Sequence, residues 1–189
     1  MISKEEYELL QFRGKREKYH SLHVKKASVT NDPTRMTMAI NQVDEEVVPR
    51  DVIINHAKEF FSKFSVEFND MEKNDFIFLL DGIKLNNKKY LEIQEKYKLN
   101  NINHLIWMKF TTKGHLGVVA ASDDINFSLK NSSGTIIKKL GLEWDESFVL
   151  LFPLAGISDG MRKDLECGLG NYLISQKVPI LDYYSHRFQ

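Results

Sequence analysis

The residues best suited to chemistry lie near the carboxyl end of the chain, in a polar turn and in the helix predicted to follow it. Ser158, Asp159 and Gly160 belong to the turn, and Arg162 and Glu166 follow within the helix. Backbone N–H groups at the start of a helix attract anions, which favours a phosphate-bearing or carboxylate ligand. A partly buried carboxylate has a raised pKa and suits acid–base or nucleophilic work. We therefore expect Glu166 and Asp159 to be catalytic and the other three residues to bind the ligand.

A second group of polar residues is expected at the same place, because it follows two other predicted strands. These residues are Ser132, Ser133, Thr135, Ser185 and His186. If strands at residues 125–129, 148–154 and 178–184 are parallel neighbours, their carboxyl ends meet at one edge of the sheet, where α/β proteins bind ligands. His186 has an ordinary pKa near neutrality, so it is a third candidate for acid–base work or for a contact to phosphate.

The same residues also have structural explanations, which stay open at this point. Ser158 and Asp159 are the ordinary composition of a helix N-cap. Arg162 and Glu166 are four residues apart, so they would form a surface ion pair on one helix face, in the less favourable order. Cys167 fits a small buried side chain better than a nucleophile.

Residues 148–182 also carry a family resemblance. The stretches concerned are the apolar strand, Asp159-Gly160, Glu166-Cys167-Gly168 and Lys177-Val178-Pro179-Ile180. In this order they resemble the carboxyl-terminal half of the nucleoside deoxyribosyltransferase-like fold, whose members cleave N-glycosidic bonds. The resemblance implies that Glu166 is the nucleophile and Asp159 the acidic residue that precedes it. The chain departs from the family in a longer stretch between Glu166 and Pro179, and the family's first strand has no counterpart near the N-terminus.

The first half of the chain, residues 1–99, is predicted to hold a β-hairpin followed by helices. Residues 20–29 and 34–43 alternate between apolar and polar side chains and flank an Asn-Asp-Pro turn, as the strands of a hairpin do. Pro49 is then expected to open a helix over residues 50–64 with a broad apolar stripe.

The second half, residues 104–189, is predicted to form the sheet. Strands are expected at residues 105–111 and 116–122, joined across Lys113 and Gly114, and a short helix at 135–140 after a break at 131–134. The terminal strand, helix and strand predict a parallel βαβ unit. The fold class is therefore α/β, a mixed sheet with helices on its faces, in a single domain over residues 1–189.

Composition limits the other possibilities. Lysine plus arginine and aspartate plus glutamate both number 26, so the net charge is zero and general attraction to nucleic acid is not predicted. Cys167 is the single cysteine, which excludes an internal disulfide and a cysteine-rich metal cage. No run approaches the ~20 apolar residues of a membrane helix, and no signal peptide is recognised. We expect a soluble cytoplasmic protein without metal or cofactor.

Three hypotheses for function remain. The first is an enzyme or sensor for a nucleotide-like or phosphate-bearing small molecule, favoured by the convergent polar turns. The second is a non-enzymatic regulator or inhibitor of a protein partner, favoured by the lack of a specific catalytic motif. The third is a nucleic-acid-binding protein or nuclease, for which Asp81, Glu143, Asp145 and Glu146 are the available carboxylates. A homodimer is compatible with each of them.

Overall fold

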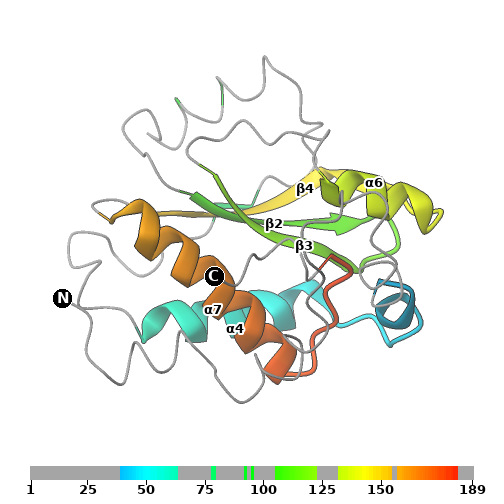
Figure 1. The fold of residues 1–189 in the computed structure, drawn as a ribbon, viewed down its shortest axis with the longest axis horizontal. Helices are drawn as coiled ribbons and strands as arrows, with labels where there is room; N and C mark the ends of the chain where they lie inside the picture. The colour runs from blue at the N-terminus through cyan, green and yellow to red at the C-terminus, as the bar shows by residue number, and fades with distance from the viewer. Residues whose placement is uncertain are drawn as a thin grey trace.

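The protein is built around an antiparallel sheet. The structure is a computed structural model that describes residues 39–63, 78–79, 92, 95, 105–122, 132–154 and 157–182. The strands are β1 (Phe78–Leu79), β2 (Leu105–Thr111), β3 (Leu116–Ser122) and β4 (Trp144–Pro153), in the order β1-β4-β2-β3. The helices are α4 (Arg50–Ser62), α6 (Ser132–Lys139) and α7 (Asp159–Ser175). Figure 1 shows α4 and α7 together on one side of the sheet and α6 near the beginning of β4.

Strand β2 is the centre of the sheet and is buried along its whole length. It pairs antiparallel with β3 on one side and with β4 on the other. Ile106, Met108 and Phe110 point to the face that α4 and α7 cover, where they join the main core. Because side chains alternate along a strand, Lys109 points to the opposite face. The predicted strands at 105–111 and 116–122 are confirmed with these bounds.

Helix α4 confirms the helix predicted after Pro49. Pro49 stands at the N-cap position, where its missing N–H costs nothing, and the helix continues to Ser62. The buried residues are Ile53, Ala57, Phe60 and Phe61, which recur at the spacing of one helical face. Phe61 stacks on Phe152 of β4 with ring centroids 4.7 Å apart, so this face attaches α4 to the sheet.

Helix α7 is buried over much of its length. Ser158 caps its N-terminus by accepting a hydrogen bond from the Met161 amide. Leu165 and Leu169 have no exposed surface and belong to the main core. Every residue from 168 to 173 is buried, so the second half of α7 is covered on all its faces. Tyr172 meets Phe60 of α4 at 5.7 Å between ring centroids.

A close contact fixes the start of β4 against β3. The pairing of β2 with β3 shifts by one residue between Lys109 and Phe110, so that Gly117 has no partner in the ladder. A methyl group built on Gly117 would lie only 2.2 Å from the Trp144 ring. The absence of a side chain at Gly117 therefore lets the indole lie against the β3 backbone. Trp144 also packs against a small second cluster that contains Ile137 of α6.

Several expectations from the sequence are wrong. Residues 39–43, predicted to end the second hairpin strand, are helical, with Ala39 fully buried. The rest of the predicted hairpin lies outside the described residues. The predicted break at 131–134 is also misplaced, since α6 already begins at Ser132 and runs through Gly134. At residues 39–43 the alternation of apolar and polar residues did not specify a strand, and at 132–134 the polar residues take part in a helix despite their weak propensity.

The predicted parallel pairing of the last two β-segments is also wrong. Both neighbours of β4, β1 and β2, are antiparallel to it. The segment at 178–182 instead lies beside β3, through a parallel bridge from Ile180 to Leu116. Since β3 and β4 are both antiparallel to β2, this segment runs in the same direction as β4 but with β2 and β3 between them. Helix α7 therefore crosses the sheet instead of joining adjacent strands.

Two helices end in the same backbone motif with different residues. At the end of α6, Gly141 has φ 68°, and Leu142 donates to the Ile137 carbonyl. At the end of α7, Lys177 has φ 62°, and Val178 donates to the Leu173 carbonyl. Both are Schellman motifs, in which the left-handed position favours glycine. The lysine therefore carries a backbone strain that the glycine does not.

This difference predicts opposite effects of two substitutions. Lys177→Gly should raise the free energy of unfolding by about 1 kcal/mol, because it relieves the left-handed strain. Gly141→Ala should lower it by about 1 kcal/mol. No atom lies within 4 Å of a methyl group built on Gly141, so that loss comes from the backbone alone. Urea unfolding of both variants measures these values, and shifts of the same sign would contradict the assignment.

Candidate functional site

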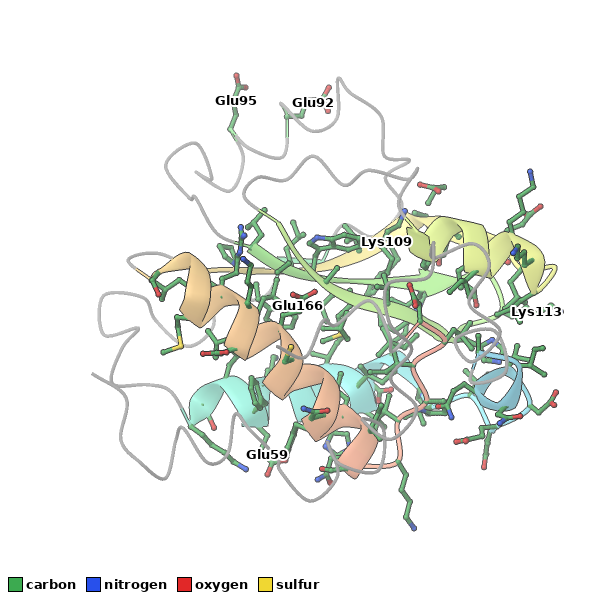
Figure 2. All side chains as sticks on the ribbon, in the orientation of Figure 1. Glu59, Glu92, Glu95, Lys109, Lys113 and Glu166 are labelled. Carbon is green, nitrogen blue, oxygen red and sulfur yellow. The ribbon has the colours of Figure 1, made fainter. Side chains whose placement is uncertain are left out.

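Glu166 lies between α7 and the sheet. Its Oε1 atom accepts a hydrogen bond from the backbone amide of Ala121, near the end of β3, at 3.1 Å. Figure 2 shows the side chain on the side of α7 that faces the strands. Its neighbours along the helix, Leu165 and Leu169, are fully buried, so the position of the helix against the sheet is fixed around it. Glu166 is therefore partly withdrawn from water and tied to a rigid strand.

Arg162 lies one helical turn before Glu166 and is more deeply buried. Only 8% of its surface is exposed. The expected ion pair between Arg162 and Glu166 was one of two exposed residues, and Arg162 is not exposed. A buried guanidinium must be compensated by polar or charged groups. Both residues belong to the first half of α7, which Figure 1 shows near the end of the sheet where β4 finishes.

The turn before α7 has a definite structural function. Ser158 is the N-cap, so its hydroxyl oxygen is occupied by the Met161 amide. Gly160 is exposed and has open space around it except for the Ser158 hydroxyl. Asp159 is the first residue of the helix, and its side chain lies outside the described residues. The structure thus brings Ser158, Gly160, Arg162 and Glu166 onto the first half of one helix.

The other predicted ligand residues are not brought to this region. Ser132, Ser133 and Thr135 form the first turn of α6, and their side chains lie outside the described residues. Figure 1 shows α6 and the start of α7 near opposite ends of the sheet. Ser185 and His186 lie outside the described residues altogether. The separation follows from β4, which starts soon after α6 and ends just before α7.

A buried lysine is the main feature that the sequence interpretation missed. The Lys109 side chain is only 2% exposed, and its Nζ lies 3.4 Å from Glu146 Oε2. The ammonium also lies 5.3 Å from the centroid of a Trp144 ring. Burial lowers the pKa of Lys109, although Glu146 and Asp145 oppose the shift. The available signal was a single charge in the apolar run Leu105–Thr111, with a carboxylate in a partner strand.

A second ion pair lies on the neighbouring residue of β4. Asp145 accepts a hydrogen bond from Arg50, the first residue of α4, at 2.5 Å. The Arg50 guanidinium also lies 4.4 Å from the Phe148 ring centroid. Burial works to raise the pKa of Asp145, but hydrogen bonds from Ser147 and Arg50 outweigh it and lower the pKa overall. Asp145 therefore connects α4 to the beginning of β4.

These ion pairs bear on the nuclease hypothesis. Asp145 and Glu146 were two of its candidate metal ligands, and in the structure each faces a cation. Within the described part of the chain, no three His, Cys, Asp or Glu side chains are grouped so as to hold a metal ion. The same part contains no helix that is long and apolar enough to cross a membrane.

Comparisons with known proteins give one partial similarity. The chain is 24% identical over 123 residues to nuclear cap-binding protein complex subunit 1 from Saccharomyces cerevisiae (strain ATCC 204508 / S288c). The match covers 65% of this chain but only 12% of that protein. No family model matches the chain. No solved structure matches it either.

The buried lysine predicts opposite effects for the two members of its ion pair. Lys109→Met should stabilise the protein at pH 7 by about 1 kcal/mol, because it removes the cost of burying the ammonium, while Glu146, whose side chain is 31% exposed, stays hydrated without its partner. Glu146→Gln should destabilise it, because the buried cation then loses its counter-ion. Thermal unfolding at pH 7 measures both, and a stabilising Glu146→Gln would contradict the assignment.

The pH dependence gives an independent check. The pKa of Lys109 is below its ordinary value of 10.5, so the unfolded chain binds its proton more tightly than the folded protein does. The contribution of Lys109 to the free energy of unfolding should therefore rise as the pH increases from the pKa of Lys109 in the folded protein towards 10.5. The Lys109→Met variant should lack this gain.

Proposed function

We propose that the protein binds a phosphate-bearing, nucleotide-like small molecule beside the first half of α7, with Glu166 and Arg162 as the central contacts. The carboxylate suits the hydroxyl groups of a sugar, and the guanidinium suits a phosphate. The observation that carries this proposal is that two ionisable side chains, one helical turn apart, are withdrawn from solvent on one helix. Charged side chains are seldom buried without a specific reason, so this pair marks a candidate functional site.

The resemblance of residues 148–182 to the nucleoside deoxyribosyltransferase-like fold supports the same location. It implies an enzyme that cleaves an N-glycosidic bond with Glu166 as nucleophile. A strand, a capped helix and an extended segment follow one another at β4, α7 and 178–182. Glu166 lies on the side of that helix that faces the strands.

Thermal unfolding with AMP, adenosine and inorganic phosphate tests the proposal. A ligand present at 100 times its dissociation constant should stabilise the protein by about 2.7 kcal/mol. We expect this for AMP, and we expect Glu166→Ala to weaken AMP binding and so reduce the stabilisation. Lys163→Ala is the matched control, because Lys163 is an exposed charge on the same helix. Unchanged AMP binding in the Glu166→Ala variant would overturn the proposed site.

A second candidate function is binding to a protein partner as part of a complex. Among the described residues, three large apolar side chains are exposed, Ile40, Val47 and Val52, and they lie within a short stretch of the chain. Scattered apolar residues are ordinary on a surface, but three within such a stretch favour a contact surface. The partial similarity to a subunit of a protein complex is compatible with this function.

A triple substitution tests the second candidate. Replacing Ile40, Val47 and Val52 by serine should leave the melting temperature within a few degrees, because the three side chains are exposed. If the stretch binds a partner, a protein that co-purifies in stoichiometric amount with the natural chain should be lost from the variant. Retention of the same partner by the folded variant would exclude this surface.

A further inference from the structure

The hydrogen bond between Glu166 and β3 brings the backbone amide of Ala121 into the proposed site. Ala121 pairs with Ile106 in the β2–β3 ladder, and Ile106 is fully buried in the centre of the sheet. Its amide donates to Glu166 Oε1, a side-chain atom from a helix 45 residues further along the chain. The Ala121 amide thus holds a side chain of α7, while Ala121 also keeps its place in the β2–β3 pairing.

We infer that the backbone amide of Ala121 is the positioning group that holds the Glu166 carboxylate for its ligand. This inference rests on the proposed function. A glutamate side chain has three rotatable bonds, and fixing them in advance removes an entropic cost from ligand binding. A donor on a strand that is paired with the buried strand β2 is more rigid than a donor on a loop. Since one oxygen is held by the main chain, the plane of the carboxylate is restricted as well.

The decisive experiment removes the amide hydrogen and leaves the side chains in place. Ala121→Pro lacks the N–H, whereas Ala121→Ser keeps it and serves as the matched control. By calorimetry, we expect AMP affinity to fall about tenfold in Ala121→Pro and to stay within about twofold in Ala121→Ser. If the proline variant does not fold, L-lactic acid at position 121 removes the same N–H through a backbone ester without restricting φ.

A double-mutant cycle separates positioning from general damage. In a Glu166→Ala background, Ala121→Pro should cause no further loss of AMP affinity, because the group that it positions is already gone. An additional loss of similar size in that background would overturn the inference, since it would show structural damage. The ester variant is judged by the same cycle.

The outcomes distinguish this inference from the proposed function. If the natural chain binds AMP and the amide-deficient variant binds it equally well, the positioning role is wrong and the site remains. If the natural chain does not bind AMP, the proposed function is overturned and the inference with it.

Discussion

The complete burial of β2 is the constraint on which the rest of the structure depends. A strand buried on both faces needs cover on both sides and partners at both edges. Strands β3 and β4 supply the edges, and α4 and α7 cover the face that carries Met108. The opposite face carries Lys109, a cation that hydrophobic cover alone cannot accommodate. Glu146 and the Trp144 ring compensate it, and both belong to the first residues of β4.

The first residues of β4 consequently make ion pairs in addition to the backbone pairing of the strand. Adjacent residues of this strand face opposite ways, and each makes an ion pair on its own face, Asp145 with Arg50 and Glu146 with Lys109. The first pair connects α4 to the sheet, and the second neutralises the centre of β2. A shift of β4 by one residue would exchange the two carboxylates and break both pairs. The charges therefore help to specify the register in addition to any contribution to stability.

The sequence predicted those parts of the fold whose signal is local. The apolar stripe after Pro49, the turn at Gly114 and the apolar runs beside it depend on neighbouring residues, and α4, β2 and β3 follow them. The partner of β4 could not be predicted in this way. The apolar sequence of β4 is equally compatible with parallel pairing to residues 178–182 and with antiparallel pairing to β2. Only the packing of the whole chain decides between the two.

The candidate site shows the same division. The sequence identified Ser158 from the polar turn before the helix, and the spacing of four residues suggested that Arg162 and Glu166 share a helix face. Whether that face meets water is a tertiary property, so the burial of Arg162 could not be read from the stripe pattern. The first turn of α6 was assigned to the same edge only through the supposed parallel strands. Once β4 separates α6 from the start of α7, that argument no longer applies to Ser132.

The bond from Ala121 to Glu166 can be explained by structure alone, since a strand amide near the edge of a sheet needs an acceptor. A neutral glutamine or serine side chain would satisfy it, and the burial of a charge is the more costly solution. The helix carries a second ionisable residue, Arg162, one turn away and more deeply buried. The Ala121 amide accounts for the position of Glu166 but not for that of Arg162, whereas the ligand that we propose would contact both charges.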